Sequence, residues 1–266
     1  MTDHDNRESE DQAQLGLQIL RREFRRYERV VVRADALEVT AGSALAGDRD
    51  AATYNPVPDL VRNILGVALD HLHALLVSVE ESDGMILAMS SFTLIRTSYE
   101  ATGTGMWLLQ PTSRDERLLR SMQLTYENRR QVRSVQTGIG KPDAGFDRME
   151  TRLRQQMEAR PRLAGKPLKP LTSVTDRLKS VAELLPKLFF PPLTLWQMAS
   201  GIAHGNSSMV IALLEREQVG PSGGRSADYN VTSSVAMIAL FYRAALEMVE
   251  ALLDLYEARN SAPDLS

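Results

Sequence analysis

Apolar residues recur at steps of three and four along most of this 266-residue chain, which is the spacing of amphipathic helices. One clear series is Leu65, Leu69, Leu72, Leu76 and Val79. The pattern predicts helices over 12–37, 59–81, 85–109, 113–136, 146–159, 173–185, 193–201 and 230–260. We recognise no run of alternating apolar and polar residues that indicates a strand. The expected fold is an all-α multi-helix bundle with a long C-terminal helix.

The helical pattern extends over 12–260 and predicts one domain there. Outside these limits we expect an acidic flexible tail over 1–11 and a flexible C-terminal tail over 261–266. Glycine, proline and asparagine predict a loop over 41–58. Residues 137–171 surround a short charged helix with glycines and prolines, and we expect a surface insertion there. Ser113 with Glu116 matches a capping box, and Gly84 is a helix stop signal.

Composition narrows the classes of protein. The chain is 43% hydrophobic and 24% charged, as in globular domains, and its net charge of −3 gives no general attraction to nucleic acid. The absence of cysteine excludes disulfides, thiolate zinc sites and cysteine nucleophiles. The polar first residues predict no signal peptide, hence a cytoplasmic location. Residues 188–214 carry only one ionisable group, but polar residues and prolines divide them too often to cross a membrane.

Two charges interrupt the apolar helix predicted over 85–109. Arg96 and Glu100 are four residues apart and therefore share one helix face, together with Phe92 and Trp107. Charges on a core-facing stripe must be paired or used, so we expect a further partner, such as His204, Tyr99 or an arginine of the next helix. An internal salt bridge, a functional polar centre and a solvent-exposed pair all remain open.

The ionisable residue of the stretch 188–214 is His204, which lies in a polar run from Ser200 to Ser208. One interpretation is a histidine that stabilises a helix break through a backbone carbonyl. The alternative is a general acid or base, because imidazole titrates near neutral pH. Ser200 and Asn206 are then candidates for substrate binding.

Three other groups of residues are weaker candidates for a functional site. Asp70 and His73 share a helix face that His71 does not, so no metal site and no cofactor are expected. The arginines between 114 and 133 form either a solvated face or a phosphate-binding stripe, with Arg117 and Arg120 as the candidates. Six arginines between 21 and 33 make the first helix basic, and whether that face packs on the bundle or binds a partner is open.

A family resemblance rests on short motifs. These are Arg96-Thr97-Ser98-Tyr99-Glu100, Trp107-Leu108-Leu109, the helix that carries Arg117 and Arg120, Ser200, and His204-Gly205. Over about 57–253 the chain resembles a group of helical proteins common in actinobacteria, which in turn resemble the HEPN superfamily. The resemblance implies a helical bundle from a toxin, phage-defence or RNA-processing system, and it adds Tyr99 to the candidate binding residues.

The chain departs from that superfamily at the nuclease motif. Active HEPN ribonucleases have an arginine four to six residues before a histidine, whereas no arginine precedes His204 more closely than Arg177. The usual nuclease centre is therefore missing, and only a rearranged centre of Arg96, Glu100 and His204 could replace it. Three functions stay open: a protein that binds RNA or a nucleotide, a noncatalytic homodimer formed through the C-terminal helix, and a small-molecule enzyme.

Overall fold

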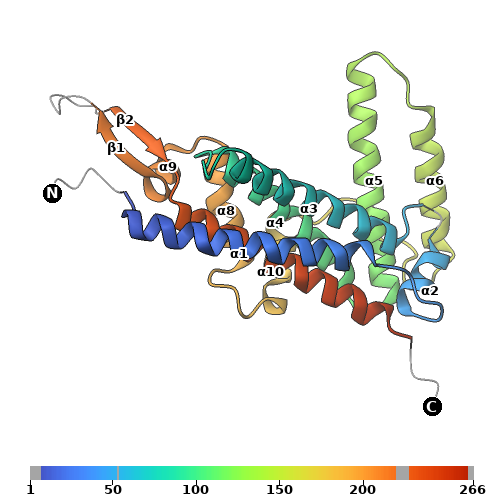
Figure 1. Cartoon of the computed structure of the whole chain (residues 1–266). Helices are drawn as coiled ribbons and strands as arrows, with labels where there is room; N and C mark the ends of the chain where they lie inside the picture. Colours follow the sequence, from blue (N-terminus) through green and yellow to red (C-terminus); the bar gives the residue numbers. More distant parts are fainter. Residues whose placement is uncertain (1–6, 53, 220–227, 263–266) are drawn as a thin grey trace.

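The computed structural model describes residues 7–52, 54–219 and 228–262, and in these ranges it is a bundle of ten α-helices with one two-stranded sheet (Figure 1). The long helices are α1 (Glu10–Asp35), α3 (Val57–Glu81), α4 (Ser90–Leu109), α5 (Arg114–Gly138) and α10 (Val235–Asn260). The shorter ones are α2 (Ala44–Ala51), α6 (Ala144–Glu158), α7 (Val174–Ser180), α8 (Pro192–Ala203), α9 (Ser207–Leu213) and the 3-10 turn η1 (Ala182–Leu184). The predicted all-α bundle with a long last helix is confirmed.

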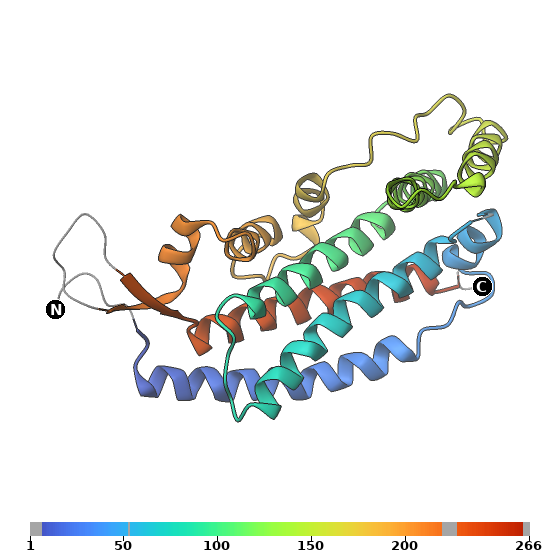
Figure 2. The same cartoon turned by 90° about the horizontal axis from the view of Figure 1, so that it is seen from above.

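Helix α10 lies at the centre of the bundle, packed between α1 and α4 and in contact with α2 and α3 (Figure 2). Twelve of its 26 residues are buried, among them Phe241, Leu246 and Leu253. The apolar stripe on which the expected homodimer rests is thus covered by helices of the same chain. Dimerisation through α10 stays a prediction, and it would have to use the remaining outer face.

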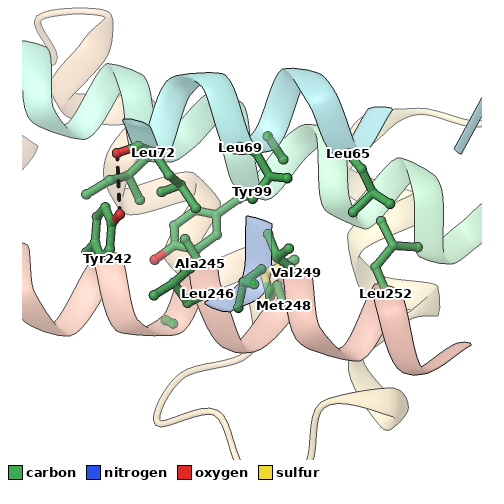
Figure 3. Close-up of a cluster of buried hydrophobic side chains, with 14 of the residues drawn as sticks. Leu65, Leu69, Leu72, Tyr99, Tyr242, Ala245, Leu246, Met248, Val249 and Leu252 are labelled. Carbon is green, nitrogen blue, oxygen red and sulfur yellow. Dashed lines mark hydrogen bonds between the residues drawn. The ribbon is translucent and has the colours of Figure 1, made fainter. Parts of the chain in front are cut away.

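Three buried tyrosines join the helices of this core through their hydroxyl groups. Tyr99 of α4 donates to the carbonyl of Phe241 on α10 at 2.7 Å, and Tyr27 of α1 donates to the carbonyl of Leu69 on α3 at 3.1 Å. Tyr242 of α10 donates to the carbonyl of Leu72 at 3.4 Å, as drawn in Figure 3. Each bond satisfies a hydroxyl that burial would otherwise leave without a partner.

The basic first helix packs on the bundle. Helices α1 and α10 run parallel, and the guanidinium groups of Arg26 and Arg33 bind carboxylates of Glu250 and Glu257 at 2.6 and 2.7 Å. The two helices approach closely at Gly16, where a Cβ atom would lie 2.6 Å from the backbone nitrogen of Ala236. Part of the arginine face of α1 is therefore neutralised inside the chain.

The described part of the predicted acidic tail is bound to the bundle. The Glu8 carboxylate accepts hydrogen bonds from the backbone nitrogens of Val235 and Ala236 and from the hydroxyl of Ser234. A carboxylate at this position stabilises the exposed N–H groups and the positive end of α10. Residues 1–6 and 263–266 of the two predicted tails lie outside the described residues.

The predicted surface insertion has a core of its own. Helix α6 pairs with α5, and Figure 1 shows this hairpin projecting from one end of the bundle. Phe146, Met149, Leu153 and Met157 of α6 are buried with Tyr126 and neighbouring residues of α5 in a second hydrophobic cluster. Residues 144–168 therefore build a packed extension of α5 and not a loose surface loop.

Three local predictions are wrong. The predicted loop 41–58 contains α2, and the strands β1 (Glu215–Val219) and β2 (Asp228–Thr232) form an antiparallel pair where no strand was expected. Ser113 makes no side-chain capping bond, and the Glu116 carboxylate lies 3.5 Å from Arg120. A complete capping box occurs at Ser9 with Gln12, at the start of α1.

Helix α3 is the one helix in the described ranges that is long and apolar enough to cross a membrane, by length and composition alone. Core helices of soluble proteins pass the same test, and eleven residues of α3 are buried against the rest of the bundle. This packing accounts for part of its apolar character, since 39% of its most apolar window is buried inside the bundle.

We predict that the stability of the fold falls steeply in alkaline solution. Burial, aided by the nearby charges of Asp70 and Asp35, raises the pKa of Tyr27 to about 12. The neutral phenol is favoured in the folded protein, so its contribution is fully present below the unfolded pKa of about 10 and is lost as the pH rises to about 12. Urea unfolding between pH 8 and 12 measures this loss. Above pH 10, the free energy of unfolding should fall less steeply in Tyr27→Phe than in wild type, by about 1.4 kcal/mol per pH unit.

The same substitution should cost about 1 kcal/mol at neutral pH, because it removes the hydrogen bond to Leu69. Tyr229→Phe on the β1–β2 hairpin is the control and should leave the slope unchanged. An identical alkaline slope for wild type and Tyr27→Phe would contradict the prediction.

Candidate functional site

The two charges predicted to face inward on α4 form a partly buried pair. The Arg96 Nη2 and Glu100 Oε2 atoms are 3.4 Å apart, and their side chains are 23% and 35% exposed. The partner that completes the pair is Trp196 of α8, whose indole nitrogen donates to Glu100 at 3.3 Å and whose ring lies 5.3 Å from the Arg96 guanidinium. The Arg96 Nε is buried and makes no hydrogen bond within the described residues.

One turn further along α4, a second arginine approaches the same face. Arg177 of α7 is 9% exposed, and its Nη1 donates to the Thr104 hydroxyl at 2.7 Å. Its Nε is buried without a hydrogen bond, and no carboxylate lies within ion-pair distance in the described part of the chain. Burial lowers the pKa of Arg177, while the charge of Glu100 raises it in part.

Trp107 is the last residue of this polar face of α4, and its ring contacts two guanidinium groups. Arg120 of α5 lies 4.8 Å from the centre of the Trp107 ring and donates to its backbone carbonyl, and Arg177 lies 5.8 Å from the same ring. Burial lowers the pKa of Arg120, and Glu116 opposes this shift. The predicted binding residue Arg120 is therefore engaged by Trp107 and Glu116.

The accessible part of the polar stripe opens into a cleft between α3, α4 and α5, with a volume of about 430 Å³. Its polar lining residues are Thr97, Glu100 and Thr104 of α4, together with Asn55, Asn63 and Asn128. Its apolar lining residues are Leu60, Ile64, Val67, Ala101 and Leu124. Volumes of this size and mixed linings of this kind are typical of small-molecule sites.

His204 stands apart from this cleft. It caps the C-terminus of α8 through its backbone, its side chain is exposed, and it forms no side-chain hydrogen bond or ion pair within the residues that the structure describes. It follows Trp196 by eight residues, which is about 12 Å along the helix axis. The structure thus brings Arg96 and Glu100 together with Trp196, and not with His204.

The neighbours of His204 have local structural contacts. Asn206 is the N-cap of α9, where its side-chain oxygen accepts hydrogen bonds from the backbone nitrogens of Ser208 and Met209 at 3.0 and 3.3 Å. Ser200 is buried, and its carbonyl accepts from the backbone nitrogen of His204. Neither side chain lines the cleft on α4.

Two further predicted binding residues are enclosed. Tyr99 is fully buried, its hydroxyl is bound to the carbonyl of Phe241, and burial raises its pKa well above the usual value. Arg117 is 2% exposed and holds Asp48 of α2 through two hydrogen bonds of 2.6 and 2.8 Å. Its Nη1 also donates to the carbonyls of Pro111 and Thr112. Neither side chain is available to a ligand in this structure.

The candidate metal ligands have separate environments. The His71 ring contacts the carbonyl of Val67 at 2.8 Å, and the His73 ring stacks on Tyr27. Among the residues described, no group of three histidine, cysteine or acidic side chains could hold a metal ion.

Sequence reasoning missed Arg177 and Trp196, although a signal for Arg177 exists. Val174, Arg177, Leu178 and Val181 recur at steps of three and four, so the arginine occupies a position on the buried face of its helix. Trp196 shows no such signal, because only the packing of α8 on α4 places its indole beside Glu100.

We predict that Asp48→Asn lowers the free energy of unfolding by about 3–5 kcal/mol, because the buried Arg117 charge loses its counter-charge. Urea unfolding measures the loss. Glu127→Gln, which breaks the exposed ion pair with Arg130, is the control and should cost no more than about 1 kcal/mol. Equal losses in the two variants would contradict the assignment of Arg117 to the core.

Arg177→Met should behave in the opposite way. Replacing a buried guanidinium that has no carboxylate partner removes its desolvation cost, so the variant should be as stable as wild type or up to about 2 kcal/mol more stable. Arg117→Met is the matched comparison and should destabilise, because it leaves Asp48 buried and unpaired. A loss of more than about 1 kcal/mol in Arg177→Met would show that Thr104 and Trp107 compensate the charge.

Comparison of the chain with protein-family models, curated proteins and solved structures found no match. The chemistry of the site must therefore be inferred from its own residues.

Proposed function

We propose that this chain is a HEPN-like, RNA-related or defence-type protein that binds a nucleotide without cleaving it, with the base in the cleft on α4. The observation that carries the proposal is the combination of one carboxylate and three side-chain amides with apolar lining residues in a single cleft. A nucleobase is flat and apolar on its faces and carries hydrogen-bond donors and acceptors along its edge. The cleft offers both kinds of contact.

Glu100 is the residue on which base selection would depend. The indole of Trp196 and the guanidinium of Arg96 hold its carboxylate in place, yet about a third of the side chain remains exposed. A carboxylate accepts hydrogen bonds and cannot donate them. It therefore favours guanine, which presents two adjacent N–H donors, over uracil, which presents one.

The charges of α5 favour a compact nucleotide over a long RNA strand. Arg129, Arg130 and Arg133 each pair with a carboxylate, at 2.7–3.0 Å. Extended nucleic acids are bound mainly through many unpaired cations along their phosphates. A face neutralised in this way, on a chain of net charge −3, gives little of that attraction.

The proposal contains no cleavage step. General acid or base catalysis requires a titratable group within hydrogen-bond reach of the reacting atoms. His204 is eight residues beyond Trp196 on α8 and does not line the cleft. Arg96 and Glu100 bind each other, which suits recognition of a ligand more than proton transfer.

Isothermal titration with the four ribonucleoside monophosphates tests the proposal, with Trp fluorescence as a second readout because Trp196 contacts Glu100. Guanosine monophosphate should bind most tightly. Glu100→Gln should weaken it by about tenfold, the cost of one charged hydrogen bond. Glu247→Gln is the control, since Arg243 and Glu247 form a pair with the same spacing and order on α10.

His204→Ala should leave the affinity unchanged, because the side chain lies outside the cleft. No saturable binding of any of the four nucleotides, or equal binding by wild type and Glu100→Gln, would overturn the proposed function. Incubation of the same proteins with total RNA should give no cleavage.

A further inference from the structure

A second pocket of about 430 Å³ lies between α5 and α6, and its chemistry differs from that of the cleft on α4. Three arginines line it: Arg129 from α5 and Arg148 and Arg152 from α6. The phenol of Tyr54 lies in the same wall. Among the residues that the structure describes, the lining contains no acidic side chain, so the pocket collects positive charge.

The acidic residues nearest to this pocket are already occupied. Asp143 binds Arg129, Asp147 binds Arg133, and Glu150 binds Arg154, at 3.0, 3.0 and 2.7 Å. Arg152 donates to the Tyr54 hydroxyl at 3.0 Å, and Arg148 has no hydrogen bond or ion pair in the described ranges. Two guanidinium groups therefore face the pocket without a counter-charge.

The N-terminus of α6 meets the pocket, and its N-cap residue Asp143 accepts a hydrogen bond from the backbone nitrogen of Gly145 at 3.0 Å. Gly145, in the first turn of this 15-residue helix, lines the pocket, and a Cβ atom there would lie 3.4 Å from the Arg129 Nη2. Asp143 Oδ1 would lie 3.3 Å from the same Cβ atom, so its carboxylate neutralises part of the positive charge of Arg129 and of the helix N-terminus. Asp143 supplies one negative charge against three arginines.

We propose that this pocket binds a phosphate group. Arginine forks match the oxygens of a phosphate, and the Tyr54 hydroxyl, which accepts from Arg152, has its own hydrogen to donate. Arg148 and Arg152 are one turn apart on α6 and reach the ligand from the same side. The site does not depend on the proposed nucleotide cleft, because a phosphate compound without a base can bind here while that cleft is empty.

The pocket has a defined place beside the cleft on α4. Asn55 lines both, while Leu124 and Asn128 of α5 face the cleft and Thr125 and Arg129 face the pocket. The phosphate could belong to a free phosphorylated compound or to the 5′ end of an RNA strand. The two sources share the phosphate monoester that the arginines would bind.

Titration of the full chain with inorganic pyrophosphate tests the proposal without involving a base. Wild type should bind it saturably, and Arg148→Gln with Arg152→Gln should weaken binding at least tenfold. Arg154→Gln is the matched control, an arginine of the same helix that pairs with Glu150 and does not line the pocket, and it should change the affinity less than twofold.

Absence of saturable pyrophosphate binding, or an equal loss in Arg154→Gln, would overturn the phosphate site and leave the nucleotide proposal to its own test. A second arm compares a short RNA with a 5′ phosphate to the same RNA with a 5′ hydroxyl, as competitors of pyrophosphate. Stronger competition by the phosphorylated RNA supports the site and identifies an RNA end as the source. Equal competition by the two RNAs, together with pyrophosphate binding that the double variant loses, supports it with a free phosphorylated compound as the ligand.

Discussion

Helix α10 can exist in water only because other helices of the chain surround it. Its buried residues lie on several faces, and a helix of this kind is stable only inside a core. Helices α1 and α4 provide most of the cover, and hydroxyl-to-carbonyl bonds from Tyr99 and Tyr242 join α10 to its neighbours. Because α10 must be covered, α4 packs one of its faces on α10. Another face of α4 contacts α7 and α8. Arg96 and Glu100 contact Trp196 of α8, and Thr104 contacts Arg177 of α7, while the cleft opens beside these contacts, between α3, α4 and α5.

Four arginines of the chain illustrate three different environments. Arg117 is buried and fully compensated by Asp48 and two carbonyls, which makes it part of the fold. Arg177 is almost as buried, but no carboxylate of the described residues pairs with it, and its charge lies near Glu100. Arg148 and Arg152 are exposed at a pocket and keep their charge available to a ligand. The number of arginines in the sequence does not distinguish these environments, because they differ in where the carboxylates lie in the fold.

Helix positions could be predicted from the sequence because the apolar period of α1, α3, α4 and α10 is long and regular. Helix α2 could not, because one reason for its position is the pair formed by Asp48 with Arg117, 69 residues further along the chain. Strand β1 is almost entirely polar, so no alternation marks it. At the site, the spacing of Arg96 and Glu100 correctly indicated a pair, whereas their partner Trp196 depends on how α8 packs against α4.

The pairing of α1 with α10 has a consequence for how the protein is made. The two helices meet through residues 224 positions apart, for example Arg26 with Glu250. At ribosomal rates of about 5–20 residues per second, α1 waits roughly 11–45 s for its partner to be synthesised. During that interval the apolar side chains of Leu20, Phe24 and Tyr27 have no α10 to cover them, while the arginines of α1 give the helix positive charge. In the folded protein, Arg26 and Arg33 of that helix pair with Glu250 and Glu257 of α10.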